Sequence, residues 1–379
     1  MISPASRASQ VSLPRYRRVW VDDAVAAIEA DQCRTADTHL IRLIVPALAG
    51  IDIYLKDEST HPTGSLKHRL ARSLFLYALC NGHIREGTPV VEASSGSTAV
   101  SEAYFAQMIG VPFYAVMPRT TSPEKIAAIT HYGGNCHLID DGRALYAEAA
   151  ALAARLGGHY MDQFTFAERA TDWRGNNNIA ESILGQMARE PHPHPAWIVC
   201  GVGTGGTSAT IGRYLRYRGL DTRLCVAEPA GQVYADAWRR RDRQARVECL
   251  SVIEGIGRQQ VEPSFQFDVV DAVIEVDDAD SIAAMLLIEQ RLGFRYGGSS
   301  GTNLVACLQL ATQMRDAGQR GSIVTVLCDR GARYRETLYD PIWREARGLQ
   351  VEARLQTLRL LLGDEPRRIH PAAGRVNDV

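Results

Sequence analysis

KDESTHPTGSLKHR, residues 56–69, is the stretch from which the fold of this chain can be worked out. The alternating apolar run before it, residues 51–55, predicts a short strand. Residues 62–64, Pro-Thr-Gly, then predict a turn, because Pro fixes φ and Gly adopts conformations that other residues avoid. Ser65 is a suitable N-cap for a helix whose apolar residues recur at helical spacing. The sequence therefore predicts a strand, a turn and a helix, with Lys67 in the first turn of the helix.

The predicted position of Lys67, in the first turn of a helix, favours the reactive, neutral form of its amine. A helix N-terminus disfavours a cation by about 0.3–1 kcal/mol, so the pKa of an amine there is expected to fall. A neutral amine is a nucleophile. A lone lysine is nevertheless more often an ordinary surface residue, so the other loops of the chain must decide.

Two further unusual loops follow predicted strands. EASSGST, residues 92–98, follows the strand at 89–92 and is rich in hydroxyl groups at a helix start. The same pattern is also typical of an ordinary helix N-cap with additional serines. GVGTGGT, residues 201–207, follows the strand at 197–200, and its glycines let the backbone approach a phosphate. A dinucleotide-binding loop is the rival interpretation, but the spacing is not GxGxxG and the loop lies far beyond the first strand.

The three loops together indicate one kind of site. Ligands of open α/β sheets bind beyond the carboxyl ends of the strands. A helix-start lysine can form a Schiff base, a glycine loop can hold a phosphate, and a hydroxyl loop can bind a substrate carboxylate. This combination predicts a site for pyridoxal 5'-phosphate.

Strands and helices alternate along most of the chain, which predicts an α/β fold with parallel sheets covered by helices on both faces. The predicted strands are 51–55, 89–92, 111–117, 135–139, 197–200, 223–227, 272–276 and 322–327. The predicted helices are 21–31, one beginning at Leu66, 98–109, 123–132, 143–156, 175–189, 207–217, 279–291, 301–313 and 341–361. The predicted regions are a flexible arm at 1–18, a catalytic region at 19–340 and a C-terminal helix and tail at 341–379. Within the catalytic region we expect a smaller subdomain at about 86–185 and a larger one formed by 19–85 and 186–340.

Composition excludes several classes of function. The chain has 379 residues, is 46% hydrophobic and carries a net charge of −1 from 42 basic and 43 acidic residues, so neither a nucleic acid nor a membrane is expected as a partner. The most apolar window, residues 40–55, is interrupted by Arg42, Pro46 and Asp52. The eight cysteines are scattered without metal-like spacing, so no metal site is expected and reduced thiols are favoured over disulfides. The N-terminus has no apolar segment of a secretory signal, and a cytoplasmic protein is expected.

Several motifs resemble those of the cysteine synthase and cystathionine β-synthase family, which are pyridoxal-phosphate enzymes of fold type II. HPTGSLKHR at 61–69 is similar to the family's N-P-T-G-S-x-K-D-R, SSGST at 94–98 to its T-S-G-N-T, and GTGGT at 203–207 to its G-T-G-G-T. Shorter likenesses, in order along the chain, are QF at 163–164, IEGIG at 253–257 and GSSG at 298–301. The resemblance runs from about Thr38 to Tyr334 and implies a tryptophan synthase β-like fold, two parallel-rich sheets wrapped by helices, and a homodimer.

The resemblance also implies the roles of individual residues. Lys67 would be the catalytic lysine that forms the Schiff base. The cofactor would be bound by Lys67, Ser97, Gly203, Thr204, Gly205, Gly206, Thr207 and Asp329. The substrate carboxylate would be bound by Ser94, Ser95, Gly96, Thr98 and Gln163.

Three positions depart from the family pattern. Ser97 replaces the asparagine that bonds the cofactor's phenolic oxygen, His68 replaces an acid or amide, and Arg330 stands where a serine usually faces the pyridine nitrogen. These substitutions, with WRGNNN at 173–178 and EGIGR at 254–258, resemble the bacterial L-cysteine desulfhydrase branch. The partner of the pyridine nitrogen stays open.

The resemblance therefore predicts a lyase that releases sulfide, pyruvate and ammonia from the small amino acid L-cysteine. A cysteine synthase, or a related cystathionine β-synthase-like replacement, remains open, because it shares the chemistry up to aminoacrylate and differs only in whether a nucleophile intercepts it. Elimination of hydroxyl from threonine is a third possibility. A catalytically silent scaffold is the non-enzymatic alternative, and the intact Lys67 and loops count against it.

Overall fold

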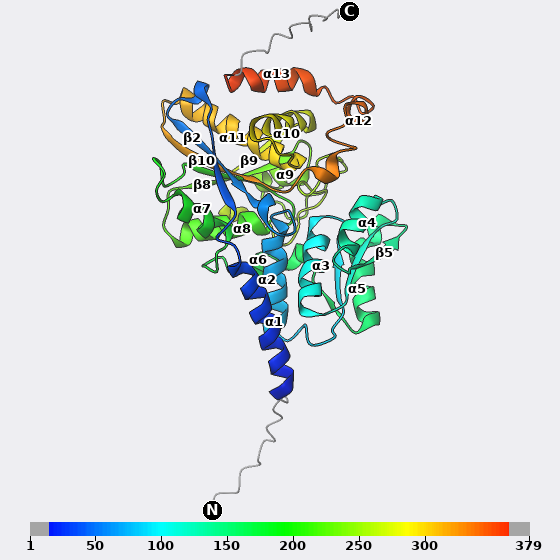
Figure 1. Ribbon diagram of the computed structural model, residues 1–379. Helices are drawn as coiled ribbons and strands as arrows, with labels where there is room; N and C mark the ends of the chain where they lie inside the picture. The colour runs from blue at the N-terminus through cyan, green and yellow to red at the C-terminus, as the bar shows by residue number, and fades with distance from the viewer. Residues whose placement is uncertain (1–14, 364–379) are drawn as a thin grey trace, which may run out of the picture. The chain divides into compact units, whose positions relative to one another are not determined.

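The computed structural model describes residues 15–363 of the chain and the side chains of residues 18–363. These residues form two compact units (Figure 1). Among the described residues, unit 1 comprises 15–36 and Leu70–Gln163, and unit 2 comprises Asp37–Arg69 and 164–363. The expected division at about 86–185 differs from these bounds at both ends.

Unit 2 contains a six-stranded sheet in the order β1-β2-β10-β7-β8-β9. All neighbouring strands are parallel except β1 and β2, which are antiparallel. The strands are β1 (His39–Leu43), β2 (Ile51–Asp57), β7 (Trp197–Gly201), β8 (Arg223–Pro229), β9 (Ala272–Val276) and β10 (Gly321–Leu327). Strand β1 was not predicted, because its run HLIRL alternates too briefly to be recognised.

Alternate residues of these strands face opposite layers of helices, as the pleat of a strand requires. Val199 and Cys225 face a core with helices α10 (Asp278–Leu292), α11 (Gly298–Asp316) and α13 (Val351–Leu361). Ile198 and Val226 face a core with helices α7 (Ile179–Met187), α8 (Gly206–Tyr217) and α9 (Val233–Arg240). The central strands are therefore buried on both faces, which explains their continuous apolar sequence.

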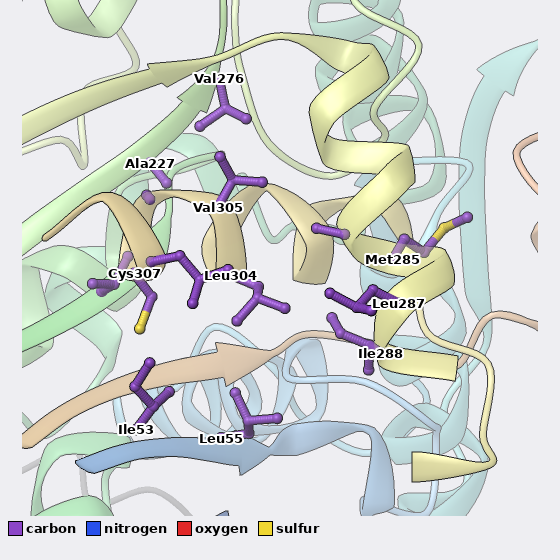
Figure 2. Close-up of a cluster of buried hydrophobic side chains, with 14 of the residues drawn as sticks. Ile53, Leu55, Ala227, Val276, Met285, Leu287, Ile288, Leu304, Val305 and Cys307 are labelled. Atoms are coloured by element: carbon purple, nitrogen blue, oxygen red, sulfur yellow. The ribbon is translucent and has the colours of Figure 1, made fainter. Parts of the chain in front are cut away.

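Figure 2 shows part of the first core, where Ile53 and Leu55 of β2 face Leu304 and Cys307 of α11. Helix α10 lies on α11 and adds Ile288, among others, to the same core. This packing fixes β2, and with it the loop that follows β2.

Unit 1 contains a four-stranded parallel sheet in the order β5-β4-β3-β6. The strands are β3 (Val90–Ala93), β4 (Phe113–Pro118), β5 (Asn135–Ile139) and β6 (His159–Tyr160). The helices are α1 (Arg15–Cys33), α3 (Ser97–Ile109), α4 (Pro123–Thr130) and α5 (Leu145–Leu156). Helix α2 (Lys67–Cys80) begins in unit 2 and continues into unit 1, and α6 (Gln163–Ala170) likewise spans the boundary of the two units.

Three predicted elements differ in extent. Helix α1 begins at Arg15, inside the predicted arm; residues 1–14 of that arm, and 364–379 of the predicted tail, lie outside the described residues. Helix α7 begins only after Asn178, whose side chain accepts hydrogen bonds from the backbone N–H of Ala180 (2.9 Å) and Glu181 (3.1 Å). The predicted helix at 341–361 is two helices, α12 (Pro341–Glu345) and α13, separated by Gly348 with φ +67°.

The two-sheet α/β architecture is as predicted from the resemblance. None of the helices in the described part of the chain is long and apolar enough to cross a membrane.

Candidate active site

The three loops of unit 2 that carry predicted site residues meet at one edge of the six-stranded sheet. The loop with Lys67 follows β2, Asp329 follows β10, and residues 203–207 follow β7. Because β2, β10 and β7 are adjacent and parallel, their carboxyl ends lie at the same edge.

The Lys67 loop is joined by its backbone to the segment after β10. The N–H of Leu66 donates to the carbonyl oxygen of Cys328 (2.8 Å), and the N–H of Arg330 donates to that of Gly64 (3.0 Å). The hydroxyl of Ser65 accepts from the N–H of Lys67 (3.3 Å), so Ser65 caps the helix as predicted. The position of Lys67 is therefore set by β2 and β10 together.

The amine of Lys67 is activated mainly by burial. Burial, followed by the charge of Arg258, lowers its pKa to about 8, whereas Cys328 and Asp329 oppose the shift. The predicted fall in the pKa of Lys67 is confirmed, but desolvation is its largest cause. Lys67 is only partly buried as a residue.

Asp329 is a buried carboxyl group beside Lys67. Its Oδ2 accepts hydrogen bonds from Arg333 Nη2 (2.6 Å) and from the hydroxyl of Tyr334 (2.8 Å). Its Oδ1 is buried and accepts no hydrogen bond within the part of the chain that the structure describes. Burial raises the pKa of Asp329, although Arg333 and Tyr334 lower it. Asp329 therefore has one carboxyl oxygen without a donor among the described residues.

Arg330 does not share this environment. Its Nε donates to the backbone oxygen of Ser59 (3.1 Å), and its methylene groups lie 3.5–3.7 Å from the position that a Cβ at Gly64 would occupy. The guanidinium is thus used to hold the loop before Lys67.

The glycine loop begins helix α8. Gly205 is the N-cap with φ +92°, a conformation that favours glycine. A Cβ at Gly205 would lie 2.5 Å from Cα of Phe265, and one at Gly203 would lie 2.4 Å from the backbone oxygen of Gly255. These glycines are therefore required by contacts with the protein itself, a reason that the sequence did not reveal. The first N–H groups of α8 have no acceptor within the helix; that of Gly206 donates to Thr204 Oγ1 (3.2 Å), and the next ones are available to an anion.

The remaining predicted residues lie in unit 1, at the carboxyl edge of its own sheet. The loop of residues 94–97 follows β3, and Gln163 follows the adjacent parallel strand β6. The hydroxyl of Thr98 donates to Oε1 of Gln163 (2.8 Å), and the N–H of Gly96 donates to Oγ of Ser94 (3.2 Å). Ser94, Ser95 and Ser97 keep part of their surface exposed, whereas Thr98 is buried. The predicted site residues thus form two groups, one in each unit.

Several residues near Lys67 were not predicted from the sequence. Arg333 and Tyr334 lie four and five residues after Asp329, and that spacing was the available signal. Arg258 was quoted only as part of a motif; its guanidinium lies 4.7 Å from the centre of the Phe164 ring.

The chain matches a family described as pyridoxal-phosphate dependent enzymes over residues 34–329. It belongs to this family. Among its relatives is an L-cysteine desulfhydrase of Mycobacterium tuberculosis, 57% identical over 89% of this chain and 93% of the relative. A cysteine synthase of Aquifex aeolicus is 29% identical over 76% of this chain and 83% of the relative.

The fold of the family is also found in solved structures. A hydrogen sulfide-producing enzyme from Fusobacterium nucleatum has a TM-score of 0.75 to this chain, with 24% identity, covering 89% of this chain and 96% of that one. At this identity the likeness concerns the fold.

The residues present in unit 2 fit pyridoxal phosphate. The lysine has a lowered pKa, the start of α8 offers N–H donors to a phosphate, and Asp329 has a buried oxygen without a donor among the described residues. These are the groups that an aldehyde, a phosphate and a ring nitrogen require.

Proposed function

We propose that this chain is an L-cysteine desulfhydrase, which converts L-cysteine and water to sulfide, pyruvate and ammonia. The observation that carries the proposal is the 57% identity to an L-cysteine desulfhydrase over 89% of the chain. The intact Lys67 environment supports an active enzyme over a silent scaffold.

Pyridoxal phosphate, when bound, supplies an electron sink that stabilises negative charge on Cα of the substrate. Lys67 Nζ supplies the base. Because its pKa is lowered to about 8, more of the amine is unprotonated near neutral pH than in an ordinary lysine, and the unprotonated amine can accept the Cα proton.

The cofactor's phosphate would be bound by the first N–H groups of α8, helped by the hydroxyls of Thr204 and Thr207. Thr204 Oγ1 accepts from the N–H of Gly206 (3.2 Å), which leaves its own proton to donate. Asp329 Oδ1 would accept from the ring nitrogen, which offers an answer to the question left open by Arg330.

The substrate carboxylate would be bound by Ser94, Ser95, Thr98 and Gln163, with the N–H of Gly96 and Ser97 close by in sequence. The amide oxygen of Gln163 already accepts from Thr98, so the NH₂ end of that amide is the end suited to a carboxylate.

Cysteine synthase is the second candidate, because a cysteine synthase covers 76% of the chain at 29% identity. The two functions are separated by incubating the purified protein with L-cysteine alone and with O-acetylserine plus sulfide. We expect sulfide, pyruvate and ammonia in equal amounts from cysteine, and slower cysteine formation from O-acetylserine. Cysteine formation that is orders of magnitude faster than sulfide release would overturn the desulfhydrase proposal and favour the synthase.

We also propose that the protein is a cytoplasmic homodimer. All eight cysteines are free thiols, which suits a reducing compartment, and Ile44, Phe294 and Ile342 of unit 2 are exposed apolar side chains that a subunit contact could bury. Light scattering of the purified protein tests the dimer, and the mass of a single chain would contradict it.

A further inference from the structure

Unit 1 contains a pair of buried carboxyl groups that the proposed chemistry does not use. Glu92 lies in β3, two residues before Ser94 of the hydroxyl loop, and Glu102 lies in α3, five residues after Ser97. Both side chains are 0% exposed. Burying an ionised carboxyl group is costly unless other groups satisfy it, so this pair requires an explanation.

Glu92 joins the two segments of unit 1 that carry the predicted carboxylate-binding residues. Its Oε1 accepts from the N–H of Ala93 (2.6 Å), at the start of the hydroxyl loop. Its Oε2 accepts from the N–H of Gln163 (3.1 Å), directly after β6. Because Gln163 in turn accepts from Thr98, the carboxyl group of Glu92 and the amide of Gln163 fix both ends of the loop.

Glu102 has only Glu92 as a hydrogen-bonding neighbour. Both of its carboxyl oxygens are buried and meet no N–H or O–H donor in the described part of the chain. Two carboxylates in contact would repel each other in this low-dielectric setting, so at least one of them must keep a proton, which the two groups can share. Burial raises the pKa of both groups, and the charge of Glu92 raises that of Glu102 further. Glu92 accepts two backbone N–H bonds and Glu102 accepts none among the described residues, so Glu92 is the better placed of the two to carry a negative charge and Glu102 to keep a proton.

Two other titratable groups, Asp162 and Tyr160, lie close to Glu92, and neither can carry a positive charge. The charge of Asp162 acts on Glu92, and Tyr160 of β6 has a buried hydroxyl with no hydrogen-bond partner within the described residues. None of the largest contributions to the pKa shifts of the two glutamates comes from a cation.

We propose that Glu102 is a positioning residue, whose carboxyl O–H donates to Glu92 and thereby orients Glu92 to hold the hydroxyl loop and Gln163 in the geometry that binds a substrate carboxylate. The role of the loop rests on the proposed function, whereas the shared proton does not.

Glutamine imitates a protonated glutamic acid, since it has a similar shape and also donates a hydrogen bond, and leucine imitates only its approximate volume.

The first experiment measures binding of L-alanine to the full-length protein with its cofactor, through the change in cofactor absorbance. L-alanine has the amino and carboxylate groups but no leaving group, so the result does not depend on cysteine being the substrate. We expect Glu102→Gln to bind within about 2-fold of wild type. Glu102→Leu and Glu92→Gln should bind about 10-fold more weakly, as expected for losing a hydrogen bond to a buried charged or polar partner. Glu148→Gln, which alters a surface carboxylate of α5 paired with Arg155, is the control and should match wild type.

The second experiment follows the unfolding midpoint of the same variants from pH 5 to pH 9. A pKa raised on folding stabilises below the unfolded value of 4.5, and that stability is lost as the pH rises towards the folded value, about 8 for Glu92. Glu92→Gln and Glu102→Gln should therefore each flatten the alkaline decline of the midpoint, because both pKa values are raised on folding. If Glu102→Gln weakens L-alanine binding as much as Glu102→Leu, the proton-donor role is wrong. If all variants bind L-alanine like wild type and differ only in midpoint, the pair serves stability alone and the positioning role is wrong. If the wild-type protein binds L-alanine but releases no sulfide from L-cysteine, the proposed function is wrong instead.

Discussion

Arg69 and Glu58 form a double hydrogen bond that fixes the helix turn carrying Lys67. Arg69 Nε lies 2.6 Å from Oε2 of Glu58, and Nη2 lies 3.0 Å from Oε1. Glu58 is fully buried just after β2, and Arg69 is two residues beyond Lys67 in the first turn of α2. The same guanidinium reaches Asp37 Oδ1 (3.0 Å) and the backbone oxygen of Asn177 (2.7 Å). A planar, bidentate donor is therefore needed at residue 69.

Replacing this guanidinium by an ammonium should be costly. Arg69→Lys keeps the charge but cannot reproduce the paired hydrogen bonds, and we expect a loss of about 2 kcal/mol in the free energy of unfolding. Urea denaturation measures it. Arg155→Lys, in a pair with Glu148 on the surface, is the control and should change stability by less than about 0.5 kcal/mol. Equal stability of the two variants would show that the Arg69 network does not fix the turn.

The buried Glu58 should make the protein sensitive to acid. Although burial alone would raise the pKa of Glu58, Arg69 and His61 hold it well below its ordinary 4.5. A depressed pKa contributes stability above 4.5 that is lost as the pH falls below that value. We expect Glu58→Gln to be less stable than wild type at pH 7 but to lose less stability between pH 5 and pH 3. Parallel acid profiles for the two proteins, followed by circular dichroism, would contradict this assignment.

The amine of Lys67 should capture the cofactor faster as the pH rises through about 8. The unprotonated amine is the reactive form, and burial followed by the charge of Arg258 lowers its pKa. Mixing cofactor-free protein with pyridoxal phosphate at several pH values gives the midpoint. Arg258→Gln removes a cation that lowers this pKa, so its midpoint should move to higher pH. A midpoint that stays in place, or moves down, would mean that Arg258 does not act on Lys67.

The glycine loop offers a matched pair of substitutions on one helix. Gly205 has φ +92° and no space for a Cβ, whereas Gly219, after the end of α8, has φ +61° and nothing within 4 Å of such a Cβ. We expect Gly219→Ala to cost about 1 kcal/mol through its backbone conformation alone. Gly205→Ala should cost more and should also release the cofactor, because Phe265 or the loop must shift. Thermal unfolding and cofactor absorbance measure the two effects. Full cofactor retention in Gly205→Ala would count against this loop as the phosphate site.

The sequence predicted most of the regular elements and the lysine, because periodicity and turn residues are local signals. It did not predict β1 or the two short helices around Gly348, since short elements depend on what they pack against. Nor could it show that Gly205 is required by contact with Phe265, 60 residues away along the chain. The pairing of Glu92 with Glu102 was likewise invisible, because it depends on how β3 and α3 face each other.

The identity of the lysine that binds the cofactor is the measurement on which the account depends most directly. The chain contains only three lysines, Lys56, Lys67 and Lys125. Lys56 is fully buried and its Nζ already contacts Gln186 Oε1 (2.7 Å) and the backbone oxygen of Thr38 (3.0 Å). Reduction of the cofactor-loaded protein with borohydride, followed by digestion and mass spectrometry, should place the pyridoxyl group on Lys67 and nowhere else. A pyridoxyl group on Lys56 or Lys125, or one that persists in Lys67→Ala, would contradict the account.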